Sequence, residues 1–206
     1  VTEQRYDHAG RLVNTIQHRH QIALDQPLST ETIQSLLYET LIENFSQENG
    51  GFSGVDGNII SWSSQTESLE VAAGYSTAGT TIVSSTRDLD VSAQEGVSVC
   101  VDVTVDEINS DTIVNHFFVG LADSQGDEIS GVYFSKGYAK TGSLQSAALK
   151  KGLTYQVEVS LFGAAVQTRL IEKNSGSILY THIEEDINLD EFGDTLKVKL
   201  KAGQFR

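Results

Sequence analysis

Alternation of apolar and polar residues with a period of two dominates the chain from residue 51 onward. In the clearest stretch, 97–105, five valines alternate with serine, cysteine, aspartate and threonine. This pattern is typical of a β-strand with one buried and one exposed face. The stretches 155–161 and 196–201 repeat it. In 196–201 the polar positions are lysines, which favours a solvated strand protected against edge pairing.

Weaker alternating stretches predict further strands in the same region. They lie at 67–73, 79–86, 115–122, 130–135, 165–172 and 177–183. Clusters rich in glycine, asparagine and aspartate separate them, as expected for turns. Many short strands at this spacing predict an all-β fold, an antiparallel sandwich or barrel.

One amphipathic helix is predicted before these strands, at residues 29–45. Ser29 or Thr30 can cap its first turn, and Glu31 lies where the helix dipole favours an acid. Its apolar stripe consists of Ile33, Leu36, Leu37 and Leu41. The sequence thus predicts three parts: an N-terminal segment and linker at 1–28, the helix at 29–45 and a β-sandwich at 46–206.

The N-terminal segment carries a motif of its own. Residues 6–13 read Tyr-Asp-His-Ala-Gly-Arg-Leu-Val, in which Asp-x-x-Gly is a turn signature between strand-forming residues. The segment therefore predicts a β-hairpin. It resembles the YD repeat of the RHS family, whose core reads Tyr-Asp-x-x-Gly-Arg-Leu followed by an apolar residue. The resemblance covers about the first 16 residues, and a lone repeat cannot bury its own apolar face.

That resemblance implies the end of a YD-repeat region within a larger parent protein, and the absence of methionine agrees with this. RHS-type proteins are large and secreted or surface-attached, which implies an extracellular or cell-surface location.

The order of elements after residue 45 adds a second resemblance. An aromatic entry at Phe45, Phe52 and Trp62, the valine-rich strand, and the stretches 117–123 and 131–134 follow one another. This layout resembles the concanavalin A-like or laminin G-like jelly roll of many lectins.

Composition excludes some classes of function. The chain has 28 acidic and 14 basic residues and a net charge of −14, which argues against nucleic-acid binding. The same charge fits calcium binding or simple solubility. Cys100 is the single cysteine, so no disulfide framework or cysteine metal site is expected. No apolar run approaches the ~20 residues that span a bilayer.

A calcium site is one candidate. Asp186, Asn188 and Asp190 have the odd-position oxygen spacing that opens an EF-hand loop. The sixth position is Glu191 rather than glycine and the twelfth is Lys197 rather than glutamate, which excludes a true EF-hand. An irregular calcium loop that also uses Asp194 is left open. The turn at 123–127 is a second candidate, for which an ordinary hairpin turn is the competing interpretation.

Glycan binding is the other candidate chemistry, because an exposed aromatic ring can stack on a pyranose face. Trp62, Tyr75, Tyr133 and Tyr138 lie in or beside segments rich in glycine and serine. Trp62 fits a core position as well. Tyr138, between two lysines in Lys-Gly-Tyr-Ala-Lys, is the first choice for an exposed stacking residue.

Catalysis has little support in the sequence. Jelly-roll glycosidases use paired carboxylates, but the Glu-x-Asp-x-x-Glu layout of the glucanases is absent. The nearest pairs involve Glu67, Asp88 and Asp102. We therefore expect a non-catalytic module that binds a glycan or cell-surface polysaccharide. The alternatives are a structural domain of the YD-repeat shell without ligand, and a glycan-processing enzyme.

Overall fold

The computed structural model describes two parts of the chain separately. The described residues are 48–75, 79–90, 96–108, 117–141, 145–162, 164–185, 187, 192 and 195–205, with the strand backbone at 2–6 and 12–17. The chain divides into a unit at Val1–Glu43 and a second at Asn44–Arg206. The predicted helix at 29–45 lies outside the described residues.

The first unit contains a β-hairpin. Strand β1 (Thr2–Tyr6) pairs antiparallel with β2 (Leu12–Gln17), with an irregularity between Arg5 and Tyr6. The hairpin predicted from the Asp-x-x-Gly signature is therefore confirmed. A hairpin is common to many folds, so it does not by itself distinguish a YD repeat.

The second unit is built from short strands and one 3-10 turn. Its elements are η1 (Glu48–Gly51), β3 (Ile60–Ser63), β4 (Ser68–Val71), β5 (Gly74–Tyr75), β6 (Thr81–Asp90), β7 (Gly96–Thr104), β8 (Phe117–Ala122), β9 (Glu128–Ser135), β10 (Tyr138–Thr141), β11 (Gln145–Ala148), β12 (Thr154–Phe162), β13 (Ala165–Glu172), β14 (Ser177–Glu184) and β15 (Thr195–Phe205). Among the described residues no helix is long and apolar enough to cross a membrane.

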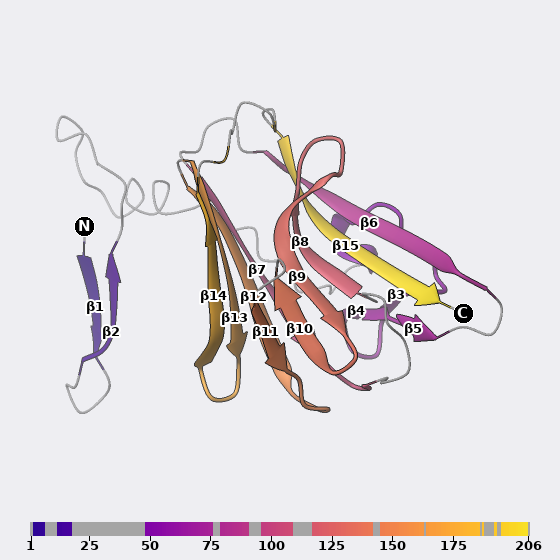
Figure 1. Cartoon of the computed structure of the whole chain (residues 1–206), viewed down its shortest axis with the longest axis horizontal. Coiled ribbons are helices and arrows are strands. Elements are labelled where there is room, and N and C mark those ends of the chain that lie inside the picture. Colours follow the sequence, from indigo (N-terminus) through magenta and orange to yellow (C-terminus); the bar gives the residue numbers. More distant parts are fainter. Residues whose placement is uncertain are drawn as a thin grey trace. The chain divides into compact units, whose positions relative to one another are not determined.

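These strands form two main sheets that pack face to face (Figure 1). Within the described residues the larger sheet has seven strands, in the order β11-β10-β9-β8-β15-β5, and β6 pairs with β15 as well. The smaller sheet has the order β14-β13-β12-β7, and β3 and β4 form a separate hairpin. Except for the short parallel contact of β5 with β15, neighbouring strands are antiparallel. The predicted antiparallel sandwich is confirmed.

The core lies between the two sheets, where alternate residues of each strand meet. The valines of β7 pack against this core, while Ser98, Cys100, Asp102 and Thr104 are exposed on the outer face. The centres of β8 and β12 contribute fully buried side chains such as Leu121. The alternation of apolar and polar residues in the sequence therefore predicts correctly which face of these strands is buried.

Strand β15 departs from its expected place. Its lysines point away from the core, as predicted, but the strand pairs with β8 on one side and β6 on the other. It is therefore an interior strand of the larger sheet, and the expectation of an edge-protecting role was wrong. Lys197 pairs with Asp88 of β6 at 2.7 Å instead, so these lysines balance charge across the sheet face.

Two paired glycines shape the outer face of the larger sheet. Gly120 of β8 lies opposite Gly131 of β9. A Cβ atom on either residue would lie 2.8 Å or 2.7 Å from the ring of Phe118 and would also overlap neighbouring backbone. The ring therefore lies against both glycines, and Phe118 is only 2% exposed although it is on the outer face.

We expect Gly131→Ala to lower the free energy of unfolding by about 1–3 kcal/mol, the usual cost of overpacking. The added methyl would collide with the Val119 carbonyl oxygen and the Phe118 ring. Denaturant unfolding measures the change. Ser84→Ala, at an exposed position of β6 on the same outer face, is the control and should change stability by less than about 0.5 kcal/mol. Equal stability of both variants would contradict the close approach.

Candidate functional site

Two of the four aromatic residues singled out in the sequence lie together on the outer face of the larger sheet. The β9–β10 turn is closed by Lys136 and Gly137, both with positive φ, as in a two-residue hairpin turn. Tyr138 then lies opposite Ser135, and Lys140 lies opposite Tyr133. Because opposite residues of an antiparallel pair share a face, these side chains form one surface. We call Tyr133, Tyr138 and Lys140 the tyrosine face.

The two tyrosines differ in how they are held. Tyr138 is 48% exposed, so its ring is accessible to a ligand. Tyr133 is half-buried, and its phenol donates a hydrogen bond to Oε2 of Glu128. The Tyr133 and Phe118 ring centroids are 4.8 Å apart with planes tilted by 50°. Tyr133 is therefore a fixed support beside a more accessible Tyr138.

Glu128 connects this support to β15. Lys201 donates to Oε1 of Glu128, and Lys199 Nζ lies 3.6 Å from the same oxygen. Lys201 Nζ also lies 5.9 Å from the Phe118 ring centroid and 5.4 Å from that of Tyr133, within cation–π range. One carboxylate thus accepts hydrogen bonds from a phenol and an ammonium group beside a buried ring, with the second ammonium group nearby.

The protonation states suit this arrangement. Partial burial acts to raise the pKa of Glu128, but hydrogen bonds from Lys201 and Tyr133 and the lysine charges outweigh it and lower that pKa. Burial, followed by the hydrogen bond to Glu128 and its charge, raises the pKa of Tyr133. Glu128 is therefore ionised and Tyr133 protonated at neutral pH, as donor and acceptor require.

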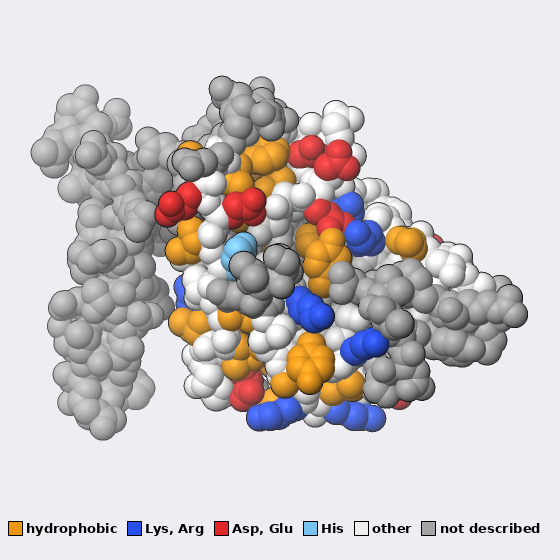
Figure 2. All heavy atoms as spheres, viewed as in Figure 1, with side chains coloured by type: hydrophobic (Ala, Val, Ile, Leu, Met, Phe, Trp, Pro, Cys, Tyr) orange, Lys and Arg blue, Asp and Glu red, His pale blue; other side chains and the backbone are white. Residues whose placement is uncertain are grey.

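Figure 2 shows this outer face from the front. Lysine side chains, a few carboxylates and apolar side chains lie next to one another over the larger sheet. The described lysines on this face are Lys140, Lys197, Lys199 and Lys201. Basic and aromatic groups thus share one surface of an otherwise acidic chain.

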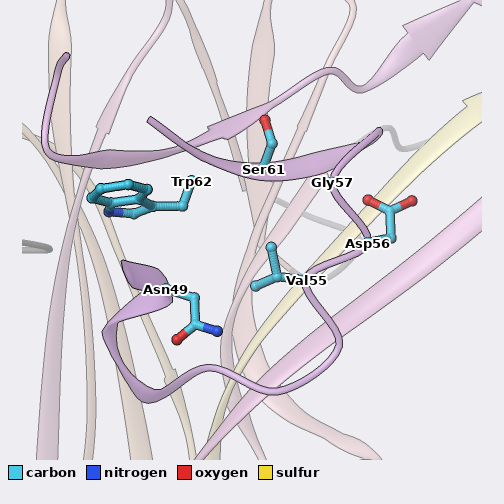
Figure 3. Close-up of a pocket in the computed structure, with 6 residues that line it drawn as sticks. All are labelled: Asn49, Val55, Asp56, Gly57, Ser61 and Trp62. Carbon is cyan, nitrogen blue, oxygen red and sulfur yellow. The ribbon is translucent and has the colours of Figure 1, made fainter. Parts of the chain in front are cut away.

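Trp62 belongs to a different part of the unit. It is half-buried in β3 and lines a hollow of about 410 Å³ with Asn49, Val55, Asp56, Gly57 and Ser61. In Figure 3 the Trp62 indole, the Asn49 amide and Val55 lie on one side of β3, while the Ser61 hydroxyl points to the other. The hollow offers an aromatic wall and an amide.

Asp56, which also lines this hollow, accepts hydrogen bonds from the backbone. Its Oδ1 accepts hydrogen bonds from the N–H groups of Asn58, Ile59 and Ile60 at 3.0, 2.8 and 2.9 Å. Burial acts to raise the pKa of Asp56, but these hydrogen bonds lower it overall. The carboxylate stabilises the turn into β3 and is not a free ligand group.

The remaining site residues predicted from the sequence lie wholly or partly outside the described residues. Tyr75 lies in β5 opposite Phe205 of β15, and its side chain is outside the described set. The predicted calcium ligands Asp186, Asn188, Asp190 and Asp194 also lie outside the described residues. Within the described part of the chain, no group of three or more His, Cys, Asp or Glu side chains could hold a metal ion.

The turn at 123–127 is an ordinary hairpin turn. Asp123 Oδ1 accepts hydrogen bonds from the backbone N–H groups of Gln125 and Asp127 at 2.9 and 2.8 Å. This carboxylate therefore closes the connection between β8 and β9. The hairpin interpretation of this segment accounts for its aspartate without a metal.

Two of the acids considered for catalysis, Asp88 and Asp102, are engaged in ion pairs. Asp88 pairs with Lys197, and Asp102 pairs with Lys173 on the outer face of the smaller sheet. Cys100 is on that same exposed face. Partial burial, with the charges of Glu158 and Asp102, raises the pKa of the Cys100 thiol, so the thiol remains protonated at neutral pH.

Comparison with known proteins identifies the fold. No protein-family model and no curated protein matches the chain. Solved structures of plant lectins do match it. Peanut lectin with a 9mer peptide has a TM-score of 0.55 at 11% identity, over 80% of this chain and 88% of that one. The second unit has the lectin-type jelly roll.

Two further lectins agree. Basic winged bean lectin with Tn-antigen has a TM-score of 0.53 at 11% identity, over 78% of this chain and 85% of that one. Lectin I-B4 from Griffonia simplicifolia, in its metal-free form, has a TM-score of 0.51 at 9% identity, over 75% and 85%. The predicted concanavalin A-like jelly roll is confirmed by these likenesses. At such low identity they establish the fold and not the ligand.

Sequence reasoning missed the groups that support the tyrosine face. Glu128 and Lys201 are 73 residues apart, and their contact depends on β15 lying next to β8. The one available signal was the excess of lysine on β15, which pointed to carboxylates on neighbouring strands.

Glu128→Gln tests the charge network through pH. A carboxylate whose pKa is lowered by folding stabilises the protein above its ordinary pKa of 4.5, and this contribution is lost as pH falls through the folded value. We expect the variant to be less stable at pH 7 by about 1–3 kcal/mol, between exposed and buried ion pairs. The difference from the unchanged chain should shrink toward pH 3. A difference that is the same at both pH values in denaturant unfolding would contradict this role.

Proposed function

We propose that the second unit is a non-catalytic carbohydrate-binding module whose contact surface is the tyrosine face. The supporting observation is Tyr138, a 48% exposed aromatic ring on a strand rather than on a mobile loop tip. The adjacent Tyr133 is fixed by Glu128 and Phe118. A rigid aromatic surface loses little conformational entropy when it stacks on a sugar ring, which favours binding.

The lectin-type fold supports the same proposal. Lectin UEA-II is described as a complex with galactose, and the winged bean lectin as a complex with Tn-antigen. Those ligands belong to those proteins. For this chain they make glycan binding the first class of function to test, while the engaged carboxylates Asp88 and Asp102 disfavour catalysis.

We further propose an extracellular or cell-surface setting within a larger YD-repeat protein. The motif at residues 6–13 and the hairpin of β1 and β2 support this part of the proposal. A purely structural role of the sandwich in such a parent protein is the alternative. The structural alternative is favoured if the isolated chain binds no glycan.

Tyr138→Ala should abolish glycan binding without unfolding the protein. The exposed ring contributes little to the core, so the melting temperature should change little, while the stacking surface is lost. A broad glycan array and a polysaccharide pull-down identify the ligand, and titration calorimetry measures its affinity. Tyr138→Phe keeps the ring and should retain binding. Ile178→Ala removes a 54% exposed side chain from the smaller sheet and is the matched control.

Trp62→Ala separates the two candidate surfaces. Binding that survives Trp62→Ala but not Tyr138→Ala assigns the glycan to the tyrosine face. The reverse pattern would move the site to the hollow beside β3. A blank array and a blank pull-down would overturn the carbohydrate proposal altogether.

We also propose calcium binding by the segment with Asp186, Asn188, Asp190 and Asp194. Oxygen ligands at alternate positions suit Ca²⁺. If calcium is present at 100 times its dissociation constant, it should stabilise the fold by about 2.7 kcal/mol and raise the melting temperature. Asp186→Asn with Asp190→Asn should remove that shift. A melting temperature unchanged by EDTA and by added Ca²⁺ would contradict the site.

A further inference from the structure

Carboxylates neutralise some lysines of the larger sheet and not others. In a chain with twice as many acidic as basic residues, four lysines share the outer face of this sheet. The three on β15 face carboxylates: Lys197 faces Asp88, and both Lys199 and Lys201 face Glu128. Among the described residues, the four ammonium groups on this face are therefore met by two carboxylates.

Lys140 is the lysine that these carboxylates do not reach. Its cross-strand neighbours are Tyr133 on β9 and Ser146 on β11, and neither carries charge. Among the described residues, no carboxylate lies within ion-pair distance of Lys140, and the side chain is exposed. The neighbours of Tyr138 are Ser135 and Ala148, which are also uncharged. Within the sheet, the accessible part of the tyrosine face thus has a lysine and no directly opposite carboxylate.

The net charge of −14 does not cancel this local charge. At physiological ionic strength the Debye length is about 8 Å, so exposed charges farther away are largely screened. Glu128, a carboxylate of this face, already accepts hydrogen bonds from Lys201 and Tyr133. A ligand on Tyr138 would therefore lie near the ammonium group of Lys140, two positions along β10 and on the same face.

We infer that the tyrosine face selects anionic glycans, polysaccharides whose sugar rings carry carboxylate groups. A ring stacks on Tyr138 while its carboxylate accepts a hydrogen bond from Nζ of Lys140, two positions along the same strand and on the same face. This inference rests on the proposed function, because it assigns a ligand class to the same surface.

The test compares uronate polymers with their carboxyl-reduced forms. Polygalacturonate, alginate and hyaluronan, each beside its reduced polymer, offer the same backbone with and without charge. Affinity is measured by titration calorimetry for the unchanged chain, Lys140→Gln and Lys173→Gln. Lys173 lies in the turn between β13 and β14 and pairs with Asp102 of the smaller sheet, so its variant makes the same charge change elsewhere.

We expect at least one uronate polymer to bind on the order of tenfold more tightly than its reduced form, the effect of one charged hydrogen bond. Lys140→Gln should remove that preference and leave binding to the reduced polymer, whereas Lys173→Gln should keep it. Tyr138→Ala should abolish binding of both the charged and the reduced form.

Three results would overturn the inference in distinguishable ways. Equal affinity for charged and reduced polymers would reject the charge selection and leave carbohydrate binding intact. Uronate binding that persists in Tyr138→Ala would mean simple ion exchange without stacking. Binding to none of the six polymers, together with a blank glycan array, would reject the proposed function and the inference together.

Discussion

The hydrogen bonds that Glu128 accepts from Tyr133 and Lys201 hold the outer face of the larger sheet in place. Glu128 and Tyr133 belong to β9 and Lys201 to β15, so the carboxylate reaches across β8. Phe118 lies beneath, against two glycines that leave room for its ring. A half-buried charge of this kind is stable because both of its oxygens have donors. The orientation of Tyr133, and with it the surface beside Tyr138, depends on this contact.

The contact of Glu128 with Tyr133 and Lys201 depends on how the strands of the sandwich are arranged. Period-two patterning buries one face of each strand and leaves the other free for polar groups. In β15 the buried positions are leucine, valine and alanine, and the outer positions are lysines. Because β15 is an interior strand, its lysines meet side chains from β6, β8 and β9. The same alternation thus builds the core on one side and the charged face on the other.

Long alternating segments could be predicted from the sequence, and short or unpatterned ones could not. The valine-rich stretch at 97–105 and the lysine stretch at 196–201 became β7 and β15. Strand β10 has only four residues, too few for a period to show, and its existence depends on the turn at Lys136 and Gly137. Tyr138 and Trp62 could be named as aromatic candidates. Their grouping could not, because strand order brings Tyr133 beside Tyr138 and leaves Trp62 in β3.

The central claim is that a glycan binds over β9 and β10 rather than beside β3. A titration followed by NMR tests it directly, since Trp62 is the only tryptophan and its indole N–H gives one signal. On addition of the oligosaccharide selected on the array, we predict shifts in the ring signals of Tyr138 and Tyr133 and in the backbone of β10. The Trp62 indole signal should stay in place. Shifts at Trp62 with unchanged Tyr138 signals would contradict the account.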